Sequence, residues 1–581
     1  MTNKTESTGI PFQGNARFEP PDGKAFYGMG QVLDQRYTSE TKPGISAVFR
    51  INNVLPHILS DYIGVSKPNA MDDVLNRVIS ISQTENKSYV AVVAVAVISR
   101  KSDLRMRDFY KGTYDQVIRG YGARLRSYGR PVFVRPLYEI NEGGTHGDYF
   151  LAKSPNPKAQ AIEGFRRVVD RMKEGAGNDL PNVAWMWHVM PIPGADNNYY
   201  ESWYPGNRYV DWIGVSLFSP NQIASGLSTV VQFARSKGNP IFIPESAPTA
   251  SIPAGVQNPK VLESYFNPYF SSIEAPSNNI KGFIYINTDW QNTPTPSWPN
   301  SQIEQAPRIV DKFAAETAKP NFQIPADTLR VGQKPFEGPG ITAGWQSQDK
   351  VLHIISKDKY WELDQKTSPG VWTKATHIAN VAPFASAPAV NGLRPWEGEG
   401  ITATWTVPSE NHRYLRIISK NRFYRYDYQT NAWYAGPNPF NDPTNYWVKA
   451  PAINGLKPTD GAGITAVWVQ SDNLLRVVSQ NRFYRYSFAA RRWDFTRAFP
   501  FPSPTNPWNK APWNNNIDRA RPWEGAGFTA AWVKDGRFLQ IMSRDKFWEM
   551  DLVTNQWTPW HGNYRDLPMN SIWKSAPFVA I

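Results

Sequence analysis

The sequence predicts a multidomain protein in which a (β/α)8 TIM barrel is followed by an all-β four-bladed propeller. Three observations lead to this fold class. The chain has 581 residues, several times what one hydrophobic core usually organises. Its first half alternates apolar, strand-length runs with amphipathic helical segments, and its second half repeats one motif four times. With 41% hydrophobic and 14% aromatic residues, the chain has the apolar surface that folded domains need.

The first half predicts parallel strands covered on both faces, because its apolar runs lack polar alternation. Expected strands are 25–30, 44–50, 89–98, 131–137, 183–187, 212–218, 240–244 and 282–286. Helical spacing of apolar residues is found at 71–83, 114–128, 162–174 and 227–237. Eight strands within about 300 residues favour a closed barrel over an open sheet.

The second half contains four copies of one pattern. Gly340-Ile-Thr-Ala-x-Trp345 recurs at 400–405, 463–468 and, with Phe for Ile, 527–532, at spacings of 60, 63 and 64 residues. Each copy continues with a second motif that begins at Ser356, Ser419, Ser479 or Ser543. A fixed period with several short strands in each unit is typical of a β-propeller.

Composition changes between the halves and sets the expected boundaries. Six of the 23 tryptophans lie before residue 320, and 17 lie after it. We expect an N-terminal extension at 1–24, the barrel at 25–318, a linker at 319–327 and the propeller at 328–581.

Two of the expected barrel strands end in a carboxylate, Glu139 after strand four and Glu245 after strand seven. Side chains alternate along a strand, so Arg135, Leu137 and Glu139 are expected on one face. The same alternation would put Ile241, Ile243 and Glu245 together. If these faces line the lumen, the carboxylates meet at the C-terminal rim, where barrel enzymes hold their active sites. Such a pair suits glycoside cleavage, whereas either Glu alone is more simply a strand-end or ion-pairing residue.

The first half resembles glycoside hydrolase family 26, a clan-A family of retaining β-mannanases and related β-glycanases. The matching segments, in the family's order, are 135–139 (Arg-Pro-Leu-Tyr-Glu), 165–166, 182–187, 204–206, 210–214 and 240–245. The resemblance implies that Glu139 is the acid/base, that Glu245 is the nucleophile and that Trp290 stacks on a sugar. Further substrate-binding candidates are Arg135, Tyr138, His188, Trp203 and Phe218.

The chain departs from the family pattern at two places. Tyr138 stands where a His usually precedes the acid, and Gly214-Val-Ser-Leu-Phe218 replaces Gly-x-Asp-x-Tyr. Phe218 lacks the hydroxyl that would hold the nucleophile, which leaves the type of glycosidic linkage open.

The sequence is compatible with two functions. The first is a retaining endo-β-glycosidase acting on a β-mannan or related β-glycan, with a propeller for surface or partner binding. The second is a weak or inactive glycan-binding attachment protein, such as a surface, toxin or injection-machine component.

The second half, from residue 326, resembles hemopexin-type blades. That resemblance implies an ion in the central channel, lined by Ile341, Ile401, Ile464, Phe528 and their neighbours. We expect no required cofactor and no metal at the carboxylates. Four arginines at equivalent positions, Arg422, Arg425, Arg482 and Arg485, could form a patch for an anionic surface or a protein partner, although solvated strand charge explains them as well.

Composition narrows the remaining partners and the location. Cysteine is absent, which excludes disulfides and thiolate chemistry. A net charge of +13 without a basic block does not favour nucleic acid, and the longest apolar run, 89–98, is too short to span a membrane. No signal peptide is visible. We therefore expect a soluble protein, extracellular or released by a leaderless route, whose partner is a polysaccharide or oligosaccharide.

Overall fold

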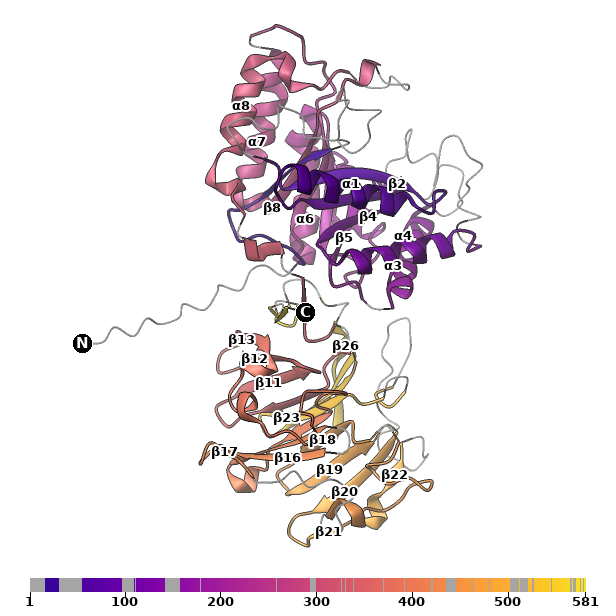
Figure 1. Cartoon of the computed structure of the whole chain (residues 1–581), viewed down its shortest axis with the longest axis vertical. Helices are drawn as coiled ribbons and strands as arrows, with labels where there is room; N and C mark the ends of the chain where they lie inside the picture. The colour runs from indigo at the N-terminus through magenta and orange to yellow at the C-terminus, as the bar shows by residue number, and fades with distance from the viewer. Residues whose placement is uncertain are drawn as a thin grey trace, which may run out of the picture. The chain divides into compact units, whose positions relative to one another are not determined.

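The computed structural model describes the chain except residues 1–15, 31–54, 97–108, 142–156, 293–298, 435–445, 502–510 and 512–520 and short gaps elsewhere. The chain divides into two compact units (Figure 1). The first takes in Met1–Val331, and the second takes in Gly332–Leu567 and Ser571–Ile581.

The first unit is a closed parallel barrel whose strands follow sequence order, β1 pairing with β8. This confirms the predicted barrel. Its strands are β1 Phe26–Gly30, β2 Ile58–Gly64, β3 Val90–Ala96, β4 Val132–Pro136, β5 Val183–Val189, β6 Trp212–Leu217, β7 Ile241–Ser246 and β8 Ile280–Ile286. Its α-helices are α1 Ala70–Thr84, α3 Asp115–Tyr128, α4 Pro157–Ala176, α5 Asn197–Glu201, α6 Leu227–Lys237, α7 Asn267–Glu274 and α8 Pro307–Thr317. The four helices expected from apolar spacing are α1, α3, α4 and α6.

The second strand was predicted wrongly. Segment 44–50 lies outside the described residues, and β2 at Ile58–Gly64 pairs with both β1 and β3. Ser60, Asp61 and Tyr62 interrupt the apolar character of β2, so this strand does not have the continuous apolar run used to find the others. Ile58 packs in the lumen, whereas Leu59 and Ile63 pack toward the helices.

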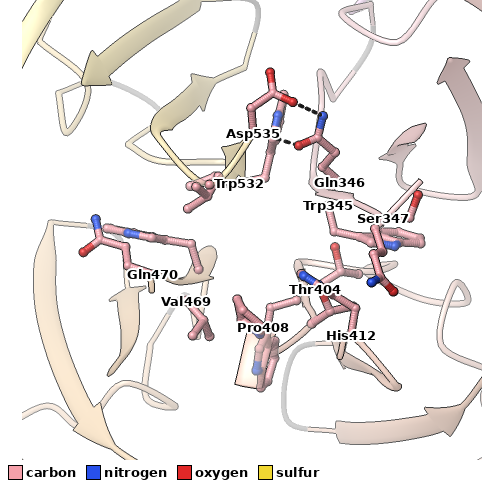
Figure 2. A pocket seen from close by; sticks show the side chains of 18 of the residues that line it. Trp345, Gln346, Ser347, Thr404, Pro408, His412, Val469, Gln470, Trp532 and Asp535 are labelled. Atoms are coloured by element: carbon pink, nitrogen blue, oxygen red, sulfur yellow. Dashed lines mark hydrogen bonds between the residues drawn. The ribbon is translucent and has the colours of Figure 1, made fainter. Parts of the chain in front are cut away.

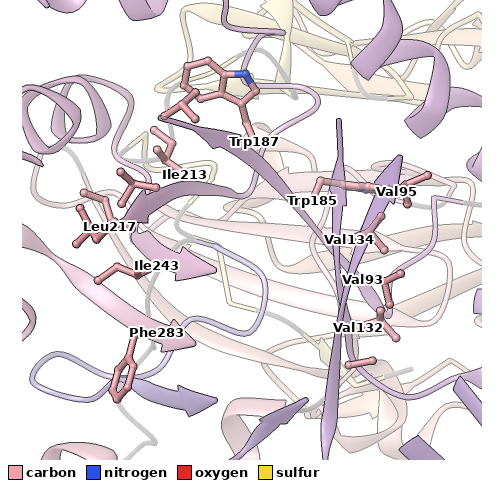
Figure 3. Packing of buried hydrophobic residues seen from close by; sticks show 14 of the residues in the cluster. Val93, Val95, Val132, Val134, Trp185, Trp187, Ile213, Leu217, Ile243 and Phe283 are labelled. Atoms are coloured by element: carbon pink, nitrogen blue, oxygen red, sulfur yellow. The ribbon is translucent and has the colours of Figure 1, made fainter. Parts of the chain in front are cut away.

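Two hydrophobic clusters lie on opposite faces of the barrel wall. The larger fills the space between strands and helices and includes Val93, Val134, Ile213 and Ile243 (Figure 3). The smaller fills the lumen. Its members are Ala16, Phe18, Phe26, Ile58, Val90, Val92, Phe133, Ala184, Met186, Trp212, Phe242 and Ile284. Because side chains alternate along each strand, these memberships show which positions face the lumen.

The second unit contains four antiparallel sheets of four or five strands, which confirms the four-bladed propeller. The blades are β10 Ala343–Gln346 to β13 Val371–His377, β14 Ala403–Trp405 to β17 Ala432–Trp433, β18 Ala466–Val469 to β21 Arg492–Trp493, and β23 Ala530–Lys534 to β26 Gln556–Asn563. Between them lie β11 Val351–Ser356, β12 Lys359–Asp364, β15 Tyr414–Ser419, β16 Arg422–Asp427, β19 Leu474–Ser479, β20 Arg482–Ser487, β24 Phe538–Ser543 and β25 Lys546–Asp551, with β22 Phe499–Pro500 paired to β20.

The ends of the second unit pair with each other, β27 Val579–Ala580 running antiparallel to β9 Gly332–Gln333. The repeated glycine has a conformational cause: Gly340 has φ 75°, which a side chain rarely adopts. A Cβ at Gly340 would also lie 2.5 Å from the carbonyl oxygen of Arg544 in the last blade. Glycine at this position therefore lets one blade pack closely on another.

We expect residues 332–581 to fold alone. The four buried clusters of the second unit draw their members from residues 336 to 576. The pairing of β9 with β27 joins the first and last strands of this unit without residues of the barrel. Circular dichroism and thermal unfolding of the fragment check this, beside a fragment that stops at residue 577 and lacks β27. The shorter fragment should melt earlier. A 332–581 fragment that aggregates would contradict the expectation.

Histidine burial gives each unit its own sensitivity to acid. Burial, helped by Lys87, lowers the pKa of His57 in the barrel to about 4. Burial also lowers the pKa of His353 in the propeller to about 4. In the unfolded chain each histidine binds a proton near pH 6.5, whereas in the folded chain it does so only near pH 4. The free energy of unfolding is therefore fully retained above pH 6.5 and decreases as the pH falls toward 4. We expect a loss of about 3 kcal/mol per histidine.

Calorimetric unfolding between pH 7.5 and 4 measures this loss. His57→Gln should flatten the pH dependence of the barrel transition only, and His353→Gln that of the propeller transition only. Unchanged slopes in both variants would show that other groups cause the acid sensitivity.

Candidate active site

Glu139 lies directly after β4, where the chain leaves regular strand geometry. Leu137 and Glu139 both adopt left-handed backbone angles, φ 54° and 52°. Such residues cost about 1–3 kcal/mol each and are typical of functional sites. Leu137 packs in the outer cluster, so the predicted common face of Arg135, Leu137 and Glu139 is wrong. The turn, and not strand alternation, brings Glu139 to the site.

A shift in strand pairing brings Glu245 to the lumen. Gly214 of β6 pairs with Phe242 of β7, whereas Ser216 pairs with Glu245, so β7 contains one extra residue. Such a β-bulge moves the following side chains to the opposite face. Ile241 and Ile243 face the helices, as members of the outer cluster. The prediction that Glu245 shares their face is therefore wrong.

The two carboxylates converge. One carboxylate oxygen of Glu139, one of Glu245 and a ring nitrogen of His188 all lie within 4.8 Å of one another. Glu139 is 5% exposed and Glu245 6%. Carboxyl groups of retaining glycosidases lie ≈5–5.5 Å apart, whereas inverting enzymes need ≈6.5–9.5 Å to admit a water. The separation suits a retaining pair.

Arg135 on β4 is fully buried and holds Glu245. Its Nη1 donates to Glu245 Oε1 at 2.6 Å and lies 3.1 Å from His188 Nδ1. Burial opposes the charge of Arg135, yet Glu245 and Tyr62 raise the pKa of the guanidinium above its ordinary value. Glu245 therefore faces a permanent positive charge at hydrogen-bond distance.

His188 and Ser216 connect Arg135 to Glu139. His188 Nε2 lies 2.9 Å from Ser216 Oγ, and Ser216 Oγ donates to Glu139 Oε1 at 2.6 Å. Both residues are 0% exposed. Burial and Arg135 hold the pKa of His188 well below its ordinary value. The two ring nitrogens of His188 face Arg135 and Ser216, and its contact with a sugar stays a prediction.

The other predicted binding residues separate into three groups. Phe218 packs with Ala247 and Ile286 in a small apolar cluster, and Trp290 packs against that cluster. Tyr138 makes an edge contact with Tyr62, their ring centroids 5.3 Å apart. Trp203 instead lies in the outer cluster between strands and helices and is buried, which leaves little of its ring for stacking. The loop after Glu139 also contains Glu142 and His146, which lie outside the described residues.

Sequence reasoning missed two lumen residues on β2. Ser60 Oγ lies 3.5 Å from Arg135 Nη2, and the Arg135 guanidinium lies 5.3 Å from the Tyr62 ring centroid. Because β2 was assigned to another segment, neither residue was considered. The adjacent polar residues Ser60 and Asp61 lie on opposite faces of this segment, so it shows neither a continuous apolar run nor a clean polar alternation.

Glu139, His188 and Glu245 could together offer ligand atoms to a metal ion. Arg135 already contacts His188 Nδ1 and Glu245 Oε1, and its positive charge opposes a cation at the same atoms. The arrangement therefore favours acid/base and nucleophilic chemistry over metal binding.

The propeller contains a separate cavity of about 400 Å³ where its innermost strands end. Figure 2 shows side chains of all four blades around it, with Gln346 hydrogen-bonded to Asp535. Gly344, Thr404, Val467 and Ala531 line it, as do Trp345, Trp405, Trp468 and Trp532 at equivalent positions. The hydroxyl of Thr404, a buried residue, has no hydrogen-bond partner among the described residues.

The predicted lining of the propeller channel is corrected. The residues named as channel lining, Ile341, Ile401, Ile464 and Phe528, instead lie in the hydrophobic clusters between blades.

The four arginines do not form an open basic patch. Arg422 and Arg482 are buried and donate to Ser419 Oγ and Ser479 Oγ of their own blades. Arg425 stacks on Tyr434, and Arg485 pairs with Asp494. The serine–arginine spacing that these two blades share is therefore a packing feature of the fold.

A parallel barrel with two buried carboxylates at its C-terminal rim is an arrangement that retaining glycoside hydrolases use. The first unit is similar to one particular family among them: residues 102–246 match Glycosyl hydrolase family 26. This confirms the resemblance inferred from the sequence.

Known proteins resemble parts of this chain. A β-1,3-xylanase of Alcaligenes sp. is 27% identical over 241 residues, which cover 38% of this chain and 49% of the xylanase. The chain thus spans about half the length of that relative. The match with the structure of GH26C from Muricauda sp. covers 54% of this chain and 90% of the GH26C chain, at 13% identity and a TM-score of 0.40. The hemopexin fold protein CP4 from cow pea covers 38% and 88%, at 14% identity and a TM-score of 0.28.

Among the helices that the structure describes, none has the length and apolar character needed to cross a membrane.

Proposed function

We propose that the first unit is a retaining endo-β-glycanase in which Glu245 is the nucleophile and Glu139 the general acid/base. The observation that carries the proposal is the approach of the two carboxylates, whose nearest oxygens lie within 4.8 Å. This separation is shorter than the ≈6.5–9.5 Å between carboxyl groups that an inverting mechanism requires.

The reaction then has two displacements. Glu245 attacks the anomeric carbon while Glu139 protonates the departing glycosidic oxygen, so the glycosidic bond breaks and a glycosyl ester of Glu245 forms. Glu139, now ionised, takes a proton from water as the water oxygen attacks the same carbon and releases Glu245. Two inversions return the β configuration. Arg135 supports the first step because its hydrogen bond and positive charge hold Glu245 Oε1 in place.

The substrate class is a β-linked mannan, xylan or glucan. Similarity to a protein named β-1,3-xylanase makes β-1,3-xylan the first substrate to test, and the family resemblance adds β-mannan. Trp290 packs half-buried against Phe218, Ala247 and Ile286, and an aromatic side chain with exposed surface suits the apolar face of a pyranose ring.

A panel of β-1,3-xylan, β-1,4-xylan, β-mannan and β-glucans, with release of reducing sugar as the readout, tests the proposal. Hydrolysis of one class by the wild type and not by Glu245→Gln is expected. The second candidate, an inactive attachment protein, is favoured by Ser216 and Phe218 in place of the family's Asp and Tyr. Binding without hydrolysis across the whole panel would select it.

We also propose that the propeller cavity binds the end of a neutral glycan. It combines apolar walls from Val467 and Ala531 with the side-chain amides of Gln346 and Gln470 and the unpartnered hydroxyl of Thr404. Amides and hydroxyls that converge on a concave apolar site are the groups that orient a small polar ligand.

We expect Thr404→Phe, which fills the cavity, to lower retention of the full chain on an insoluble polysaccharide by about tenfold, the loss of roughly 1.4 kcal/mol. The retention assay uses the Glu245→Gln background so that the polysaccharide stays intact. Val553→Ser, at a surface position 76% exposed, is the control. Equal retention of both variants and the parent would contradict a binding role for the cavity.

A further inference from the structure

The buried side chains between the two carboxylates form one continuous hydrogen-bonded chain. It runs from Glu245 through Arg135, His188 and Ser216 to Glu139, at successive distances of 2.6, 3.1, 2.9 and 2.6 Å. These residues come from β4, β5, β6 and β7 and the turn after β4. Only the end members, the two glutamates, have any exposed surface, 5% and 6%.

The direction of each hydrogen bond in this chain is fixed by Arg135. A guanidinium has donors only, so His188 Nδ1, facing Arg135 Nη1, must be the acceptor. A neutral imidazole then carries its single proton on Nε2, which donates to Ser216 Oγ. The one hydroxyl hydrogen of Ser216 is left to donate to Glu139 Oε1, the geometry observed.

We propose that His188 and Ser216 are positioning residues that fix which oxygen of Glu139 carries the catalytic proton. Since Oε1 accepts the Ser216 hydroxyl, the proton that Glu139 delivers is carried on Oε2. The inference rests on the proposed function and adds to it a buried relay that the family resemblance does not supply, because Ser216 stands where the family usually has Asp.

The relay also connects the two catalytic steps. Arg135 Nη1 is shared between Glu245 Oε1 and His188 Nδ1. When Glu245 becomes an ester, it loses its negative charge and accepts less strongly from Nη1. Arg135 then donates more strongly to His188, and Ser216 to Glu139, which favours the ionised Glu139 that the second step needs as a base.

The groups that face His188 are consistent with a neutral ring. Arg135 approaches it from β4, Glu245 from β7 at 4.0 Å, and Ser216 from β6, while Glu139 lies beyond Ser216. Burial together with Arg135 keeps the pKa of His188 well below its ordinary value. The ring is therefore expected to keep the same tautomer throughout the working pH range.

Kinetics on two substrates tests the positioning role. Ser216→Ala and His188→Leu should lower hydrolysis of the polysaccharide, whose leaving group needs a proton, by about 10²-fold, at the lower end of what general acid catalysis contributes. Hydrolysis of an activated aryl glycoside should fall far less, and the alkaline limb of the pH profile should move to higher pH. Ser216→Thr and His188→Gln, which keep the donors, should recover at least part of the loss.

Ser60→Ala is the matched control, since it removes another buried lumen hydroxyl near Arg135 that is not in the chain. Any loss in this variant should be shared by both substrates. If Ser216→Ala also lowers both substrates equally, with an unchanged pH profile, its role is structural and the proposal is wrong.

Imidazole ¹H–¹⁵N NMR of the full chain tests the proposed tautomer of His188 and needs no measurement of enzyme activity. The chain has seven histidines, and loss of one signal in His188→Gln assigns that residue. A neutral ring protonated at Nε2 from pH 5 to 8 is the expected result. Protonation at Nδ1, or an imidazolium in this range, would overturn the proposal. If the wild type hydrolyses nothing, the proposed function fails, and the NMR result still judges the relay.

Discussion

Glu245→Ala is expected to abolish turnover of every β-glycan and aryl glycoside, by on the order of 10⁴-fold or more in kcat, as removal of a catalytic nucleophile does. No other described carboxylate is positioned to replace Glu245, since Glu139 is expected to have the proton-transfer role. Initial rates on an activated aryl glycoside and on the polysaccharide measure the loss. Full activity in the variant would move the nucleophile elsewhere.

The control for this variant must address folding. Arg135 is fully buried and loses its ion-pair partner in Glu245→Ala, and breaking such a pair by removing one member costs about 3–5 kcal/mol. Thermal unfolding should therefore be compared with that of Glu245→Gln, which keeps an acceptor for Arg135. A small anion such as azide can replace the missing carboxylate. Recovery of turnover with azide would show that the site is intact.

Glu139→Ala should affect substrates unequally. Polysaccharide hydrolysis should fall by about 10²–10⁴-fold, because the departing sugar oxygen needs a proton. Formation of the glycosyl ester from an aryl glycoside with a good leaving group needs no proton and should be spared. Release of the second sugar from the ester then becomes slow, so a burst of the aryl group followed by a slow phase is expected.

Pre-steady-state measurement of aryl release tests this difference. Glu139→Gln, which is similar in size and cannot transfer the proton, is the matched variant and should behave in the same way. Equal losses on both substrates, without a burst, would mean that the acid/base role is assigned to the wrong residue.

Much of the fold could be predicted from the sequence because its signals are local and repeated. Apolar runs such as 89–98 and 212–218 mark buried strands, and the four-fold motif around Trp345 marks the blades. β2 could not be found in this way, since Ser60 and Tyr62 face the lumen of the site and interrupt the apolar run. Polar residues needed at a site thus weaken the pattern that predicts the strand.

The catalytic candidates were predicted from the sequence, but the reason given for their convergence was wrong. Simple alternation would put Glu245 on the face of Ile243, and only the extra residue in β7 turns it inward. The left-handed turn at Leu137 and Glu139 is equally invisible in the sequence, because neither residue type favours that conformation. The role of His188 depends on contacts with Arg135 and Ser216, 53 and 28 residues away.

The anomeric configuration of the first-formed product tests the central claim most directly. NMR during hydrolysis of the best substrate of the panel distinguishes the two outcomes before mutarotation mixes the anomers. Carboxylates with nearest oxygens within 4.8 Å predict that the β anomer appears first. Initial appearance of the α anomer would contradict a double displacement by Glu245 and Glu139.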